Sequence, residues 1–265
     1  MVPESHKISL QDFRFHTGDV LPQLHLHCTT WGNPKGQAVM LLHGTNGSAA
    51  SLVTPEWQET LFGPGQALDL NHHWVIAPDA LGCGRSSKPS QGLKARFPRY
   101  NYADMVQAQH RMLTEGLGVH HLKALIGYSM GGMHTWLWAQ KHPGFMDAAV
   151  PMACMPTPIS GRNWMMRRMV IDAIRNDPEW QQGEYQRPLA SAHTALTYYA
   201  VATSGGPAAR RNAVKAASTK TYSHDVERDT HAAVRCLPAP AASIRASTIG
   251  ESPEVRYRVC LIART

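Results

Sequence analysis

The stretch Gly127-Tyr-Ser-Met-Gly131 constrains the fold more than any other part of this 265-residue chain. It follows an apolar run, Ala124–Ile126, and precedes a segment of helical character, Met133–Lys141. A Gly-x-Ser-x-Gly motif between a strand and a helix predicts a sharp turn with a strained serine at its tip. The residues two positions before and after that serine must be very small, because strand and helix nearly touch there.

This turn makes Ser129 the candidate nucleophile. Its hydroxyl is expected to stand clear of the sheet at a helix N-terminus, where backbone N–H groups favour negative charge. We therefore predict that Ser129 is catalytic and that Gly127 and Gly131 are the glycines of the turn. The alternative is a glycine-rich corner that carries an incidental serine, and the order strand, turn, helix favours the nucleophile.

Strand, loop and helix patterns alternate along most of the chain. The patterns predict two antiparallel strands at 7–15 and 23–31, and strands buried on both faces at 38–42 and 74–77. They also predict an amphipathic helix at 102–117 and a further strand at 146–154. This alternation predicts an α/β fold, a mostly parallel sheet flanked by helices. Its loops should gather at the C-terminal edge of the sheet, where such folds bind ligands.

Composition divides the chain into three parts. We predict a core at 1–156, a helical cap at 157–206 with helices near 163–176 and 189–203, and an atypical basic tail at 207–265. The tail holds ten Lys/Arg against five Asp/Glu, and within it only 255–262 reads as a strand. The Met- and Trp-rich part of the cap has two open interpretations, an apolar lid or the core of the cap: Trp164, Met165, Met166, Met169.

Composition also argues against several classes of protein. No apolar run approaches the ~20 residues that span a bilayer, and the N-terminus has no signal-peptide core, which predicts a cytoplasmic protein without a membrane partner. The tail arginines are dispersed and carry no nucleic-acid motif, so no nucleic-acid partner is expected. Five scattered cysteines form neither a disulfide framework nor a metal pattern. His25 and His27 share a strand face and allow a metal site, but a solvated face is favoured and no cofactor or metal is predicted.

Amide donors for an oxyanion can be placed. One is the backbone N–H of Met130, the residue after the nucleophile, and the other is expected in the loop after the 38–42 strand, at Thr45. An ordinary strand-end turn is the alternative for His43-Gly44. Gly82-Cys-Gly84 lacks the third glycine of a dinucleotide fingerprint, so we interpret it as a tight structural turn beside the site.

The acid and base of a catalytic triad cannot be assigned. In this arrangement they follow the serine, acid first. His134 and His142 lie on the helix after Ser129, expected at its surface or its C-terminal cap, and Asp172 and Asp177 belong to the cap. His193 and Asp147 also follow the serine. Four further candidates crowd into a short tail segment, which favours a solvated charged stretch: His224, Asp225, Asp229, His231. We predict that no histidine nitrogen reaches the Ser129 hydroxyl.

From about residue 36 to 206 the chain resembles the α/β-hydrolase superfamily and, within it, the homoserine O-acetyltransferase-like group. The resemblance rests on four segments: Asp104-Met-Val-Gln-Ala-Gln109, Gly127-Tyr-Ser-Met-Gly-Gly-Met133, Ala149-Val-Pro-Met152, and Asn176-Asp-Pro-Glu-Trp180 with Gly183 and Tyr185. It implies an α/β-hydrolase fold with a helical cap and makes Ser129 the acyl-accepting nucleophile. The family continues with two strands that carry the triad Asp and His. Because the resemblance ends near Gly206, it implies a fold that is incomplete at its C-terminus, through truncation or a frameshift.

Three functions remain open on this sequence. The first is a hydrolase that acts on a small ester or acyl compound through an acyl-serine intermediate. The second is acyl transfer from acetyl-CoA to homoserine. Against it, Leu81-Gly-Cys-Gly-Arg-Ser-Ser87 stands where true acetyltransferases carry Gly-Gly-Cys-x-Gly-Ser-Thr and looks like a general hydrolase loop. The third is a non-catalytic remnant that lacks the triad acid and base.

Overall fold

The structure is a computed structural model that describes residues 2–45, 47–52 and 54–203. These residues form two compact units. One comprises residues 2–87 and 98–157, and the other comprises residues 88–97 and 158–203. The predicted tail at 207–265 lies outside the described residues, as do its strand-like segment and its two histidines.

Six strands form one sheet in the described part of the first unit, in the order β1-β2-β4-β3-β5-β6. The β1–β2 and β2–β4 pairs are antiparallel, and the β3–β4, β3–β5 and β5–β6 pairs are parallel. This mixed, mostly parallel sheet confirms the predicted fold class, and every strand predicted outside the tail is present. The bounds are β1 (Glu4–Arg14), β2 (Val20–Gly32), β3 (Gln37–Leu42), β4 (His73–Pro78), β5 (Ala124–Tyr128) and β6 (Ala149–Met152).

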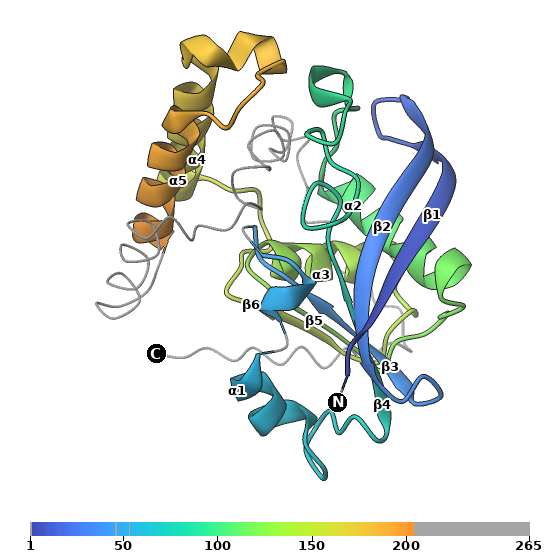
Figure 1. The fold of residues 1–265 in the computed structure, drawn as a ribbon. Coiled ribbons are helices and arrows are strands. Elements are labelled where there is room, and N and C mark those ends of the chain that lie inside the picture. The colour runs from blue at the N-terminus through green and yellow to red at the C-terminus, as the bar shows by residue number, and fades with distance from the viewer. Residues whose placement is uncertain (1, 46, 53, 204–265) are drawn as a thin grey trace. The chain divides into compact units, whose positions relative to one another are not determined.

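The hydrophobic patterns explain how these strands are buried. In β3 the four residues from Val39 to Leu42 are at most 2% exposed, as a strand covered on both faces requires. Val39 and Leu41 pack with Leu52 and Phe62. The helices α1 (Pro55–Trp57) and η2 (Gln58–Phe62) lie on that side of the sheet, while α2 (Tyr102–Arg111) and α3 (Met130–Lys141) lie on the other (Figure 1).

One face of β2 differs from its prediction. Leu24, Leu26 and Cys28 are buried as the alternation predicts, but His27 on the opposite face is only 5% exposed instead of solvated. β2 is an interior strand, and the loop after β4 folds back along it, so that the Ser86 hydroxyl accepts the His27 N–H at 3.0 Å. Within the described residues no group of three or more His, Cys, Asp or Glu side chains is placed to hold a metal ion.

The predicted helix at 102–117 is present as α2, followed by the π-helical turn η4 (Met112–Gly116). Its expected stripe is buried, with Met105, Ala108, Met112 and Leu113 fully covered. Three short 3-10 turns are also present: η1 (Ala49–Ser51), η3 (Lys94–Arg96) and η5 (Pro178–Gly183).

The second unit contains α4 (Gly161–Arg175) and α5 (Ala190–Thr203), which confirms the two predicted helices. Its apolar centre is a cluster of aliphatic side chains: Val170, Ile174, Leu189, Ala192, Leu196. Trp164, Met165 and Met169 are 38%, 62% and 66% exposed, so the interpretation of these three as core of the cap is wrong. No helix in the described ranges is long and apolar enough to cross a bilayer.

Asp104 ties the β1–β2 hairpin to the start of α2. Its carboxylate is 2% exposed, accepts the His16 N–H at 2.8 Å and the Asn101 N–H at 2.9 Å, and lies 2.6 Å from His16 Nδ1. Asn101 in turn accepts the Ala103 and Asp104 N–H groups, completing a capping box. One buried carboxylate therefore fixes both where α2 begins and where the hairpin lies.

We expect Asp104→Ala to lower the free energy of unfolding by about 3 kcal/mol, because buried backbone donors lose a charged acceptor. Glu115→Ala is the matched control, since Glu115 pairs with Arg111 on the same helical segment but its side chain is 51% exposed. That change should cost no more than about 0.5 kcal/mol. Urea unfolding followed by circular dichroism measures both, and equal costs would contradict the assigned role.

Candidate active site

Ser129 lies at the junction of β5 and α3 in a strained backbone conformation. Its φ is 53° and its ψ is −117°, a region that residues with a side chain rarely adopt. Neighbouring elements hold the strain in place: the Ser129 N–H donates to the Met152 carbonyl oxygen at 2.9 Å, and the Ser129 carbonyl oxygen accepts the Met133 N–H at 3.1 Å. The strained turn expected at this serine is confirmed.

The flanking glycines are required by the close approach of strand and helix. A Cβ on Gly127 would lie 2.2 Å from the Gly131 carbonyl oxygen, and a Cβ on Gly131 would lie 2.3 Å from that of Leu42. Both obstacles are backbone atoms that cannot rotate away. Neither position therefore has room for a side chain.

The loop after β3 runs against this turn. A Cβ on Gly44 would lie 2.8 Å from Tyr128 Cε2 and 3.4 Å from Ser129 Cβ. Thr45 follows directly, and Met130 is the first residue of α3, so its N–H has no acceptor within the helix. Met130 therefore directly follows the serine, and Thr45 directly follows the glycine that approaches it. That these two residues are the oxyanion donors stays a prediction.

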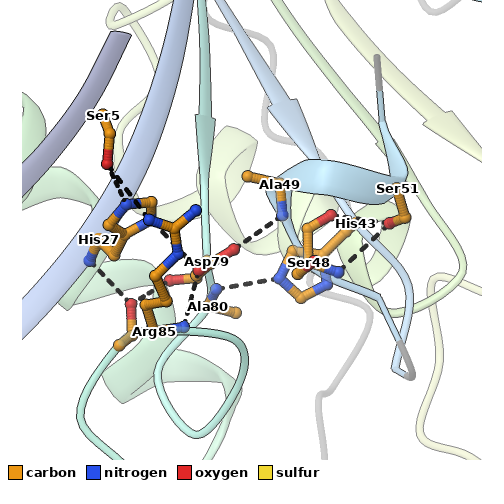
Figure 2. Close-up of polar contacts among 10 residues, drawn as sticks. Ser5, His27, His43, Ser48, Ala49, Ser51, Asp79, Ala80 and Arg85 are labelled. Atoms are coloured by element: carbon orange, nitrogen blue, oxygen red, sulfur yellow. Dashed lines mark hydrogen bonds and ion pairs between the residues drawn. The ribbon is translucent and has the colours of Figure 1, made fainter. Parts of the chain in front are cut away.

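His43 is a structural residue of this loop. Its ring is buried, Nδ1 donates to the Gly44 carbonyl oxygen at 2.8 Å, and Nε2 accepts the Ala80 N–H at 3.0 Å (Figure 2). Burial lowers the pKa of His43, which keeps the ring neutral and preserves this pattern of one donor and one acceptor. The His43-Gly44 segment is thus anchored to the end of β4.

Asp79 anchors the same loop from the other side, and the sequence interpretation missed it. Its Oδ1 accepts the Ala49 N–H at 2.7 Å, and its Oδ2 accepts the Arg85 N–H at 2.8 Å (Figure 2). Gly84, with φ 52°, has no room for a Cβ, which would lie 2.3 Å from Asp79 Cγ. The interpretation of Gly82-Cys-Gly84 as a tight structural turn is confirmed. An aspartate directly after a buried apolar strand is the signal that points to Asp79.

The candidate acid and base residues of a triad lie in different parts of the structure. His134 is 1% exposed, so the expectation of a surface position on α3 is wrong, whereas His142 is the C-cap residue of that helix, as expected. Asp172 and Asp177 lie in the second unit. Among the described residues the Ser129 hydroxyl has no side-chain hydrogen bond. The expectation that no histidine reaches it stays a prediction, because His224 and His231 lie outside that range.

His134 is held neutral inside the first unit. Burial and the nearby His43 lower its pKa to about 3. Gln109 Nε2 lies 3.4 Å from His134 Nδ1, Gln109 Oε1 accepts the Trp138 Nε1–H at 2.9 Å, and the Tyr102 ring meets the imidazole edge-to-face. His134 Nε2 makes no hydrogen bond in the structure. This side chain is a buried packing residue.

Comparisons with known proteins agree with this geometry. A family model described as alpha/beta hydrolase fold matches residues 37–239. A homoserine O-acetyltransferase of Haloarcula marismortui is 31% identical over 203 residues, 69% of this chain and 49% of its own length. One of Thermobifida fusca is 35% identical over 187 residues, 64% of this chain and 48% of its own. The chain thus spans about half the length of the curated relatives it matches.

Solved structures show the same fold. Esterase E22 superposes with a TM-score of 0.73 at 19% identity, over 89% of this chain and 78% of that one. A homoserine O-acetyltransferase of Bacillus anthracis gives a TM-score of 0.69 at 20% identity, over 89% and 76%. The resemblance stated from the sequence is confirmed.

We expect Gly131→Ala to destabilise the protein by about 3 kcal/mol, because the added methyl meets the Leu42 backbone. Gly144→Ala is the control, since a Cβ there has no atom within 4 Å. Its effect should stay within about 0.5 kcal/mol. Thermal and urea unfolding measure both, and a Gly131→Ala protein as stable as Gly144→Ala would refute the close approach.

The depressed pKa of His134 predicts a dependence of stability on pH. Below pH 6.5 the unfolded chain takes up a proton on this residue, and the folded chain does so only near pH 3. The free energy of unfolding must therefore fall with decreasing pH across this window. His134→Phe should remove up to ~1.4 kcal/mol per pH unit from that slope. Urea unfolding from pH 7 to 4.5 tests this, and identical slopes for both proteins would contradict it.

Proposed function

Because the chain belongs to the α/β-hydrolase family, we propose that it is a serine hydrolase acting on a small ester or acyl compound through an acyl-Ser129 intermediate. The observation that carries the proposal is the strained conformation of Ser129 at the N-terminus of α3. Strain of this kind costs of order 1–3 kcal/mol and persists only where the surroundings impose it. Here it presents a hydroxyl at the positive end of a helix.

The proposed reaction has two steps. Ser129 Oγ attacks the acyl carbonyl carbon, the ester C–O bond breaks, and the alcohol leaves with a proton. Water then attacks the acyl-serine, releasing the acid and restoring the hydroxyl. The backbone N–H groups of Met130 and Thr45 are the proposed oxyanion donors, each worth ~10²–10³ in rate. The chemistry needs no metal or organic cofactor from the protein.

The turn after β4 supports hydrolysis as the first choice. Leu81-Gly-Cys-Gly-Arg-Ser-Ser87 differs from the acetyltransferase loop, and its polar groups form hydrogen bonds within the turn. Ser86 Oγ donates to the Asp79 carbonyl oxygen at 2.6 Å, and the Gly82 N–H donates to the Ser87 carbonyl oxygen at 3.0 Å. These contacts build a self-contained turn that supports the loop after β3.

A second candidate function has the same first step, acylation of Ser129, but a different acceptor of the acyl group. The relatives of Haloarcula and Thermobifida are homoserine O-acetyltransferases, which favours transfer of an acetyl group from acetyl-CoA to homoserine. Both functions require a base for the Ser129 proton. Loss of a triad histidine costs ~10⁶ in turnover, so a chain with no base at Ser129 is a binding remnant and not an enzyme.

We expect p-nitrophenyl acetate to acetylate Ser129 rapidly and then to turn over more slowly, and Ser129→Ala to abolish both the adduct at this position and the turnover. Stopped-flow absorbance and mass spectrometry of the Ser129 peptide are the measurements. Ser9→Ala, which removes an exposed hydroxyl on β1, is the control and should react like the unmodified protein. Acetyl-CoA with homoserine tests the transferase. Equal rates for Ser129→Ala and the unmodified chain, with no Ser129 adduct, would overturn both functions.

A further inference from the structure

A second serine, far from Ser129 in the sheet, contacts a buried histidine. Ser5 Oγ on β1 lies 2.7 Å from Nε2 of His27 on β2, and His27 Nδ1 lies 3.2 Å from Oδ2 of Asp79 at the end of β4 (Figure 2). Three strands separate β1 from β5 in the sheet. At the usual spacing between strands this places the cluster ~19 Å across the sheet from the strand that carries Ser129.

The proton positions in this cluster follow from its chemistry. The Asp79 carboxylate already accepts the Ala49 and Arg85 N–H groups, so it faces His27 as an anion. It attracts the Nδ1–H tautomer of His27, although Nδ1 makes no aligned hydrogen bond. Nε2 is then the acceptor, and the Ser5 hydroxyl donates to it. Burial lowers the pKa of His27 in spite of the carboxylate, so the ring is a neutral base.

Ser5 lies at the surface, in contrast to the two residues behind it. Ser5 and Arg85 are exposed, whereas His27 and Asp79 are 5% and 3% exposed. Arg85 Nη1 donates to Ser5 Oγ at 3.5 Å, so a guanidinium cation lies beside the hydroxyl. A buried neutral base and a nearby cation are the parts that activate a surface serine.

We propose that Ser5, His27 and Asp79 form a second acyl-accepting site, which takes small activated acyl esters from solvent with Ser5 as the nucleophile. Ser5 Oγ forms a bond to the acyl carbon while the bond from that carbon to the leaving oxygen breaks. The hydroxyl proton passes to His27 Nε2 and from there to the departing oxyanion. The product is O-acyl-Ser5 and the free alcohol, with no oxidant or further reactant required.

The same pair of strands supplies an internal control. Ser9 Oγ lies 2.9 Å from His25 Nδ1, and Ser9 and His25 are paired in register on β1 and β2. This contact uses the other ring nitrogen, and His25 has no ion pair with a carboxylate in the described part of the chain. Ser5 and Ser9 therefore differ in the buried Asp79 behind the base, in the contact with Arg85 and in the burial of the histidine.

The experiment measures acetylation of Ser5 and Ser9 by p-nitrophenyl acetate in a Ser129→Ala background, using peptide mass spectrometry at several times. A working general base contributes 10²–10⁴ in rate, so Ser5 should be labelled about 10²-fold faster than Ser9. His27→Gln should reduce Ser5 labelling to the Ser9 level. Because Ser129 is absent from this background, the outcome is independent of the hydrolase proposal.

Two results would overturn the second site: Ser5 labelled no faster than Ser9 in the folded protein, or Ser5 labelling unchanged by His27→Gln. If His27→Gln does not fold, the folded Ser129→Ala protein is compared with the same protein in urea. Ser5 labelling should then fall about 10²-fold on unfolding while Ser9 labelling changes little. An equal rate for Ser5 in both states would also overturn the site.

Discussion

The close approach of β5, α3 and β3 around Ser129 is the constraint on which the rest of the structure depends. The absent side chains of Gly127 and Gly131 let the backbone of α3 come within contact of β5 and of Leu42 at the end of β3. A helix that starts so near the sheet forces the connecting residue into a positive φ. The strain at the serine is thus a consequence of packing between three elements and not of its own sequence preference.

The loops around this corner are fixed by buried polar groups. His43 binds its own loop and the Ala80 N–H, and Asp79 binds Ala49 and Arg85, so that the chain after β3 and the chain after β4 are joined at two points. Because burial makes an unpaired backbone N–H costly, each of these contacts fixes the position of a loop. Rigid loops at the C-terminal edge of a sheet are what a preorganised oxyanion site requires.

Asp79 connects the two serine clusters. Its Oδ1 accepts the Ala49 N–H in the chain after β3, and its Oδ2 accepts the Arg85 N–H in the turn after β4 and also lies against His27 beneath Ser5. One side chain thus stabilises a turn and polarises a histidine. The sharing follows from the sheet order, in which β4 lies between β2 and β3.

The sequence by itself determined where the six strands and the four helices α2 to α5 lie along the chain, because apolar runs, alternation and the glycines at 127 and 131 favour these local structures. It also determined that Ser129 sits in a tight turn. It did not indicate the short helical segments α1 and η2. The tertiary structure alone decided that His27 and His134 are buried and that Asp79 joins two loops. It also decided that Trp164, Met165 and Met169 are exposed. Those outcomes depend on which distant segments cover a side chain. The spacing of apolar residues within one segment carries no information about the segments that pack against it.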